Sequence, residues 1–403
     1  MKKIRKIINS RENVNNFLIA FLFCTPMLSF IINMNNIIPY LLMAISLFLI
    51  IINKKTLKKT VTTVTPIIVF FFLFFILFLF SNFIRLGWDK EFIQRVLYFA
   101  IFGVVSCFCI KIVLNSEEGL KTRKIVVGML GIYAILSLFI MDINFWTYNV
   151  AERMAISYYM LPLYVGILLE FFMDKKRSVK KYILKYVLYL IIFFPYFDFF
   201  MKYISRGVVL ALMCCFIICL LCNQKKKRKM QMLIVLLVII VILMVFALDI
   251  LKAVQSILKS VNISFYAIDK TVRLLEEGNL GDGRDTLYGN ALDGIKEHPI
   301  LGNGIGQYKT NYGTYPHNLL LQLWYEGGIF YLLICSIPIL YAISRVIFSD
   351  KIEWEIKYLY ILVFSVSIIR LMLSYEYWKD IFYWICFYLS LEIMKRKKGK
   401  HEK

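Results

Sequence analysis

The chain alternates between apolar blocks of roughly 20 residues and short polar connections. A helix rises about 1.5 Å per residue, so roughly 20 apolar residues cross the hydrocarbon core of a bilayer, which is about 30 Å thick. The blocks of suitable length and composition lie near residues 16–33, 36–53, 61–84, 92–114, 125–143, 156–173, 182–201, 206–222, 231–251, 324–346, 356–374 and 380–394. We therefore predict an all-α fold, a polytopic membrane protein with about 12 transmembrane helices.

One long polar connection interrupts this alternation and divides the chain into three parts. Residues 252–318 have the composition of a soluble segment. Residues 1–251 hold the first nine predicted spans, and residues 319–403 hold the last three. If the chain carries out chemistry, the polar connection is where its reactive residues are expected, because lipid-facing helices have little use for clustered polar residues.

The pattern inside this connection predicts a helix followed by a turn. Leu287, Ala291 and Ile295 recur every four residues and form one apolar stripe of a helix over 284–297. Pro299 cannot continue that helix.

Gly302, Gly304 and Gly306 come next, and Asn318 begins another helical run that continues into the tenth span. The glycines have the spacing of a nucleotide-binding loop, but no strand precedes them, so sharp turns are the better interpretation. The connection is therefore expected to form a long helical loop: helix, glycine turn, helix.

Composition and charge agree with a membrane protein and predict its orientation. Hydrophobic residues make up 60% of the chain and charged residues 18%, against about 45–50% and about 25% in soluble proteins. The net charge of +22 comes from basic runs between the apolar blocks. With both termini in the cytoplasm, 32 Lys and Arg of the short connections fall inside and 8 outside. The long loop is then external, and the basic runs are expected to meet anionic lipid and not nucleic acid.

Cysteines and metal ligands offer no second candidate site. All nine cysteines lie within predicted spans and none lies in the loop, so we expect packing between helices and no disulfide framework. The histidines lack neighbours at metal-ligand spacing. Asp282 and Asp285 offer two carboxylates for a divalent ion, a weaker alternative, and we expect no metal.

Two arginines at predicted helix starts are candidates for binding an anion. Arg206 opens the eighth span directly after a short external connection, and Arg284 opens the loop helix. A charge at the membrane interface is costly and is a functional candidate by default. Each arginine could grip a phosphate with two parallel hydrogen bonds. The plainer interpretations are an interfacial anchor for Arg206 and a solvated pair with Asp285 for Arg284.

His317 is the candidate base. It precedes Asn318 at the start of an apolar helix, where outward-pointing N–H groups favour an anion and a neutral imidazole. A neutral imidazole could accept a proton from a hydroxyl or hold it by a hydrogen bond. A histidine that merely caps the helix is the alternative.

Taken in order along the chain, these segments resemble the O-antigen ligase and polymerase superfamily. The resemblance rests on Ser205-Arg206-Gly207, the helix that runs from Arg284 through Tyr288 to Ala291, Pro299-x-Leu301-Gly302-x-Gly304-x-Gly306, His317-Asn318-x-x-Leu321-Gln322 and Glu326-Gly327-Gly328. It covers about residues 205–330. Tyr288 stands where family members often have tryptophan, and Arg153 is not followed by the asparagine-bearing segment common in the family.

The resemblance implies a reaction and roles for these residues. Such enzymes move a glycan from undecaprenyl pyrophosphate to an acceptor hydroxyl outside the bacterial cytoplasmic membrane, without a nucleotide cofactor or a metal. Arg206 and Arg284 would bind the pyrophosphate, and His317 would act on the acceptor. Glu326 would orient His317 or take the proton itself. We also expect the substrate to contact the residues beside them, Asn318 and Tyr288.

Three functions remain open at this stage. The first is a polymerase that joins lipid-linked repeat units into capsule or O-antigen polysaccharide, with an acceptor glycan and a chain-length regulator as partners. The second is a ligase that transfers the finished glycan to lipid A core or another acceptor. The third, of another class, is a flippase for lipid-linked oligosaccharides, which should hold its substrate near the bilayer midplane.

Overall fold

Helices are the only regular elements in the part of the chain that the structure describes. The computed structural model describes residues 2–31, 37–53, 60, 66–116, 119–140, 150–173, 187, 189, 193–279 and 281–395. Its first half contains α1 (Lys2–Ile31), α2 (Ile37–Ile52), α4 (Pro66–Leu86), α5 (Lys90–Tyr98), the π-helix η1 (Phe99–Val105), α6 (Ser106–Asn115), α7 (Thr122–Ile140), α8 (Val150–Tyr159), α9 (Leu161–Met173) and α11 (Phe194–Tyr203). Its second half contains α12 (Arg206–Cys222), α13 (Lys226–Ser260), α14 (Tyr266–Glu276), α15 (Arg284–Glu297), α16 (Gln307–Tyr312), α17 (Leu319–Phe348), α18 (Trp354–Leu373), the short 3-10 helix η3 (Tyr377–Lys379) and α19 (Ile381–Lys395). The predicted all-α class is confirmed.

Six stretches among the described residues are long and apolar enough to cross a membrane. They are Ile68–Leu86, Lys90–Asn115, Thr122–Phe139, Glu152–Met173, Leu319–Phe348 and Trp354–Leu373. Two shorter apolar helices occupy Val14–Leu28 and Arg206–Cys222. The multi-pass helical architecture is therefore confirmed. The number of about 12 spans and the external side of the loop stay predictions, and much of the predicted span 182–201 lies outside the described residues.

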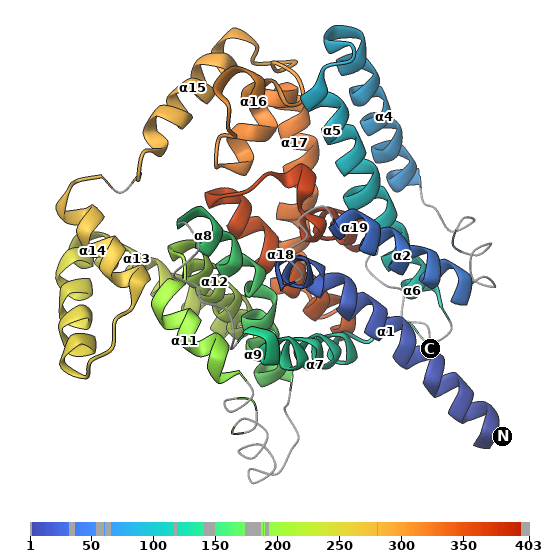
Figure 1. Cartoon of the computed structure of the whole chain (residues 1–403), viewed down its shortest axis with the longest axis horizontal. Coiled ribbons are helices and arrows are strands. Elements are labelled where there is room, and N and C mark those ends of the chain that lie inside the picture. The colour runs from blue at the N-terminus through green and yellow to red at the C-terminus, as the bar shows by residue number, and fades with distance from the viewer. Residues whose placement is uncertain are drawn as a thin grey trace.

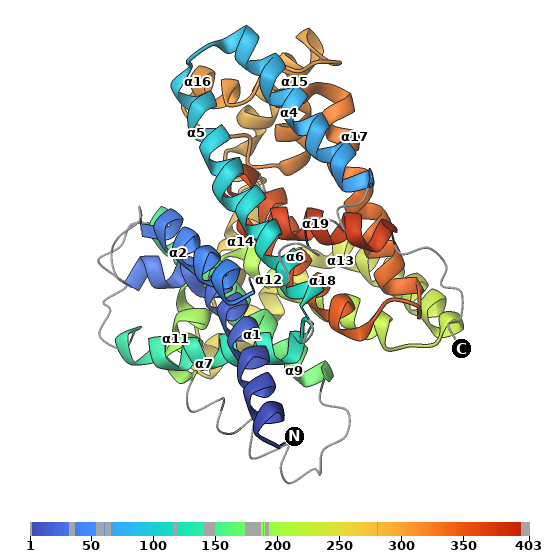
Figure 2. The same ribbon diagram turned by 90° about the vertical axis from the view of Figure 1, so that its right-hand side faces the viewer.

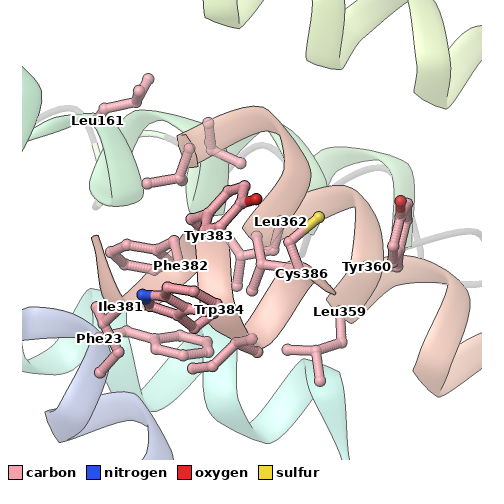
Figure 3. Close-up of a cluster of buried hydrophobic side chains, with 14 of the residues drawn as sticks. Phe23, Leu161, Leu359, Tyr360, Leu362, Ile381, Phe382, Tyr383, Trp384 and Cys386 are labelled. Carbon is pink, nitrogen blue, oxygen red and sulfur yellow. The ribbon is translucent and has the colours of Figure 1, made fainter. Parts of the chain in front are cut away.

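The C-terminal helices α18 and α19 form the centre of the molecule. Both are apolar around their whole circumference, a pattern typical of helices buried on all sides. Leu359 and Cys386 are fully buried within this cluster, shown in Figure 3. The Tyr360 hydroxyl donates to the carbonyl of Ile339 in α17, and Ser390 of α19 donates to Tyr360. Hydrogen bonds of this kind hold apolar helices in register where water is absent.

The second part of the predicted loop lies at one end of the molecule and consists of α15, the glycine turn and α16. We call this unit the helical hairpin. In Figures 1 and 2, α15 and α16 lie beside the ends of α4, α5 and α17, away from both chain termini. The helix predicted over 284–297 is α15, with the same bounds. Ala291 and Ile295 of its stripe are buried as expected and pack against Tyr308 and Tyr325, whereas Leu287 is half-buried.

The entry to this hairpin differs from the prediction in one respect. Helix α13 does not end near residue 251 but continues to Ser260, with non-helical angles at Phe246 inside it. Helix α14 then leads toward α12, and the two lie side by side. The chain thus returns to the start of α12 before α15 begins.

Candidate active site

A pocket of about 210 Å³ lies where α8, α12, α14 and α15 meet. Four of its lining side chains are charged, and three of these are cations. The polar side chains in its wall belong to Tyr158, Ser205, Arg206, Tyr266, Lys270, Asp282 and Arg284. The two arginines singled out in the sequence therefore share one pocket, although 78 positions separate them in the chain.

Both arginines stand at the first position of a helix. Helix α12 begins at Arg206 because Ser205 is its N-cap, and the Ser205 hydroxyl accepts a hydrogen bond from the backbone N–H of Val208. Helix α15 begins at Arg284 after Gly283, whose φ of 80° is in the left-handed region that glycine adopts easily. The N–H groups at a helix start carry partial positive charge. Each arginine thus adds a full charge where the backbone already favours an anion.

Lys270 is the third cation of the pocket, and the sequence did not single it out. Its Nζ lies 2.5 Å from Oδ2 of Asp282, and Nη2 of Arg206 lies 3.2 Å from the same oxygen. Lys270 is three residues after Ala267 and four before Leu274, both buried. This spacing puts it on the buried face of α14, where an unpaired lysine is rare, and that is the signal that could have identified it.

His317 lies near this pocket in an unusual conformation. Its backbone has a φ of 54°, and its ring lies 4.1 Å from the ring of Tyr315. Burial and, after it, the nearby charge of Arg284 lower the pKa of His317 to about 4, although Glu376 acts in the opposite direction. The buried Nδ1 has no hydrogen-bond partner within the described part of the chain. The imidazole is therefore neutral at physiological pH and keeps an unused polar atom.

The other two predicted contact residues differ in their surroundings. The side-chain oxygen of Asn318 caps α17, accepting hydrogen bonds from the N–H groups of Leu320 and Leu321 at 3.0 and 3.2 Å. This cap fixes the point at which the helix begins, two residues after His317. Tyr288 lies one turn along α15 from Arg284, half-buried, and does not line the pocket. Their contact with substrate stays a prediction.

A buried arginine from α18 connects the pocket with the histidine. The guanidinium carbon of Arg370 lies 3.7 Å from the ring centre of Tyr375 and 5.2 Å from that of Tyr158, distances typical of cation–π contacts. The backbone N–H of Tyr375 donates to the hydroxyl of Tyr315, whose ring packs against that of His317 at an angle of 32°. No pattern in the sequence relates Arg370 to these tyrosines.

Glu326 points away from the pocket into a buried hydrogen-bond network. Its carboxylate accepts hydrogen bonds from the Tyr377 hydroxyl at 2.7 Å, the Trp378 indole at 2.8 Å and the Gln322 amide at 3.1 Å. No hydrogen bond or ion pair joins Glu326 to His317 among the described residues. The carboxylate instead holds the segment 374–380, which includes Tyr375.

The same segment is held from a second side by an ion-pair cluster. Glu376 accepts a hydrogen bond from Arg95 of α5 at 2.5 Å and is paired with Lys379 at 2.9 Å. Burial works to raise the pKa of Glu376, but Arg95 and Lys379 outweigh it and the pKa is lowered. The segment 374–380 is thus fixed from α5 and from α17 at once.

The glycine turn supplies hydrogen-bond donors at a break in α17. At Gly328 the backbone has φ 72° and ψ −173°, so the helical hydrogen bonds are interrupted there. The N–H groups of Asn303 and Gly304 donate to the carbonyls of Tyr325 and Glu326 at 2.6 and 3.0 Å. The predicted turn is confirmed, since Gly302, Gly304 and Gly306 all have positive φ. The turn serves to dock the hairpin onto the broken helix.

Gly302→Ala is expected to destabilise the protein through this contact. A Cβ at residue 302 would lie 2.5 Å from the backbone nitrogen of Gly328, whereas at Gly313, which has a similar φ, a Cβ would meet nothing within 4 Å. Both variants should lose about 1–3 kcal/mol from the positive φ, and Gly302→Ala a further 1–3 kcal/mol, about the cost of overpacking. Thermal unfolding in detergent, followed by tryptophan fluorescence, measures the difference. Equal unfolding midpoints for Gly302→Ala and Gly313→Ala would show that the contact between the turn and α17 does not stabilise the protein.

Metal ligands and thiols give no further site in the described ranges. No group of three or more His, Cys, Asp or Glu side chains lies together there. The nine cysteines are free and are buried or half-buried. The expectation of a metal-independent reaction stays a prediction.

Comparison with known proteins agrees with the resemblance seen in the sequence. Residues 191–335, about a third of the chain, match the family model described as O-antigen ligase. No curated protein matches the chain. The matched segment contains Arg206, Lys270, Arg284 and His317. The resemblance to the O-antigen ligase and polymerase superfamily is therefore confirmed, and it supports a polymerase or ligase role in polysaccharide biosynthesis.

Proposed function

We propose that this chain, whose residues 191–335 match the O-antigen ligase family, is a glycan polymerase of the bacterial cytoplasmic membrane. It would join oligosaccharide repeat units carried on undecaprenyl pyrophosphate into capsule or O-antigen polysaccharide at the outer face. The observation that carries the proposal is the convergence of Arg206 and Arg284 on one pocket, with His317 close enough for Arg284 to act on its pKa.

The chemistry of such a transfer suits these groups. The acceptor hydroxyl attacks the anomeric carbon of the donor, the bond from that carbon to the pyrophosphate oxygen breaks, and undecaprenyl pyrophosphate leaves. Arg206 and Arg284 stabilise the charge that develops on the leaving group. His317 removes the hydroxyl proton. No nucleotide or redox cofactor is needed, since the pyrophosphate is itself the leaving group.

Donor binding would also make His317 a better base. The positive charge of Arg284 is one of the two causes that hold the pKa of His317 near 4, after burial. A bound pyrophosphate neutralises that charge, so the pKa of the imidazole rises when the donor arrives. The base would then gain proton affinity only in the loaded enzyme.

Glu326 acts in this scheme as a positioning residue. It accepts hydrogen bonds from Tyr377 and Trp378, and the same segment carries Tyr375, whose N–H donates to the hydroxyl of Tyr315, the residue packed against His317. The carboxylate therefore influences His317 through the backbone of residues 374–380 and not through direct contact. This assignment replaces a role for Glu326 as the proton acceptor.

Glu326→Gln is expected to lower kcat about tenfold with a change of less than about threefold in KM for the donor. Because the amide cannot accept all three hydrogen bonds, the segment 374–380 shifts. The surroundings of His317 then change, and the pH at which activity falls on the acid side of the profile moves. Glu326→Asp should recover part of the activity. Glu355→Gln is the control, because Glu355 is a half-buried carboxylate on α18 that accepts a hydrogen bond from the Thr122 backbone, remote from the pocket. An unchanged pH profile in Glu326→Gln would refute the positioning role.

The polymerase and the ligase differ in the acceptor that they need. Purified protein given only lipid-linked repeat units should produce ladders of increasing glycan length if it is a polymerase. Product that appears only after addition of lipid A core or another terminal acceptor would establish the ligase instead. Movement of lipid-linked glycan across vesicles without any transfer product would establish a flippase. A chain-length regulator, the further partner we expect, should change the ladder distribution and not the initial rate.

A further inference from the structure

The pocket contains a carboxylate of the protein itself, that of Asp282. Oδ2 of Asp282 is shared by Arg206 Nη2 at 3.2 Å and Lys270 Nζ at 2.5 Å. A single oxygen between two cations from different helices is the arrangement that a phosphate oxygen would adopt in the same place.

The charges of the pocket are unbalanced even with this carboxylate present. Arg206, Lys270 and Arg284 supply three positive charges against the one negative charge of Asp282. The hydrogen bond from Lys270 lowers the pKa of Asp282, and Arg206 and Arg284 lower it further against the opposing effect of burial. Asp282 is therefore ionised, and the pocket retains an excess of two positive charges. A diphosphate would satisfy that excess better than the carboxylate does.

Asp282 lies in a segment whose backbone would allow its carboxylate to move out of the pocket. Its own φ is 55°, in the left-handed region, and Gly278 and Gly283 on either side have φ values of 66° and 80°. A Cβ added at either glycine would meet nothing within 4 Å, so the segment has no close neighbours at these points. Its side chain remains about one-third exposed, whereas that of Lys270 is 16% exposed. The carboxylate can leave toward solvent, while the lysine is held in the wall.

We propose that Lys270 is a third ligand of the donor diphosphate, and that the Asp282 carboxylate occupies the phosphate position until the donor displaces it. The inference rests on the proposed function, because it takes the donor to be a polyprenyl diphosphate. In the empty protein Asp282 offsets the repulsion between clustered cations and keeps Arg206 and Lys270 aligned. In the loaded protein the diphosphate takes over both contacts.

Binding of farnesyl diphosphate to the purified full-length protein in detergent tests the inference. Lys270→Ala should weaken binding about tenfold, the loss of one charge-assisted hydrogen bond, and Lys270→Arg should retain most of it. Asp282→Asn should tighten binding about three- to tenfold, because the internal competitor is removed. Asp293→Asn is the matched control: it removes the same charge from an exposed site on α15, where Asp293 pairs with Lys296 at 2.8 Å, and should leave binding unchanged.

The outcomes separate this inference from the function on which it rests. Weaker binding in a well-folded Asp282→Asn protein would overturn it, since the carboxylate would then be a positioning group for the cations. Tighter binding of phosphatidylglycerol vesicles without tighter binding of farnesyl diphosphate would overturn it as well, since the site would then serve lipid headgroups. If Arg206→Ala and Arg284→Ala proteins bind farnesyl diphosphate like the wild type, the proposed function itself fails, whatever the Asp282 variant does.

Discussion

Replacing His317 with alanine is expected to lower kcat for glycan transfer by about 10²–10⁴-fold, the usual contribution of a general base. KM for the lipid-linked donor should change by less than about threefold, because Arg206 and Arg284 hold the diphosphate in the pocket. Steady-state transfer of a labelled repeat unit, at varied donor concentration, measures both quantities. His298→Ala is the control, since His298 lies exposed at the end of α15, in the same part of the chain.

Two further measurements on His317 distinguish a base from a residue that only orients the acceptor. His317→Gln keeps a hydrogen-bond acceptor but cannot take a proton, so it should be nearly as impaired as His317→Ala. With a pKa of about 4, the imidazole of the free enzyme is neutral above that value. The wild-type kcat/KM should therefore fall as the pH drops through about 4 and should not change around pH 6.5 on account of this group. A His317→Gln protein with most of the wild-type activity would contradict the role as base.

The helical hairpin could be predicted from the sequence because its signals are local. The apolar stripe of α15 depends only on spacing along one helix, and Leu287, Ala291 and Ile295 supply it within nine residues. Asn318 is an N-cap by residue type, and its side chain does cap α17. Positive φ at the three glycines follows from the absence of a Cβ.

The partners of the candidate site could not be predicted in the same way. Tyr158, Lys270 and Arg370 come from three helices, and their meeting depends on how those helices pack. Hydrophobic periodicity identifies which face of a helix is buried but not which other helix covers it. The convergence of Arg206 and Arg284 was expected only through the family resemblance.

The direction of Glu326 could not be predicted either. Glu326 lies about two turns into α17, on the same buried face as Leu319 and Gln322. Helical periodicity indicates that this face is buried but not which element covers it. The family resemblance suggested that Glu326 orients His317 or takes the proton itself, whereas the carboxylate faces Tyr377 and Trp378.

Arg284→Ala is expected to lower kcat/KM for the lipid-linked donor by about 10²–10³-fold, the usual loss when one preorganised donor to a developing negative charge is removed. Arg206→Ala should have an effect of similar size. If both side chains bind one diphosphate, the double variant should be less impaired than the product of the two single losses, with a coupling of about 0.5–3 kcal/mol. Lysine at either position restores the charge but not the paired hydrogen bonds, so it should recover only part of the activity.

The double-variant cycle is the sharper measurement, because a merely structural arginine would also lower activity when it is removed. Arg273→Ala provides the control, since Arg273 on α14 is 64% exposed and pairs only loosely with Glu277 at 3.8 Å. Losses at Arg206 and Arg284 that multiply without coupling would mean that the two arginines act on separate groups. The pocket would then not hold a single diphosphate, although both side chains line it. Coupled losses, together with an unimpaired Arg273 variant, would support a common anion between the starts of α12 and α15.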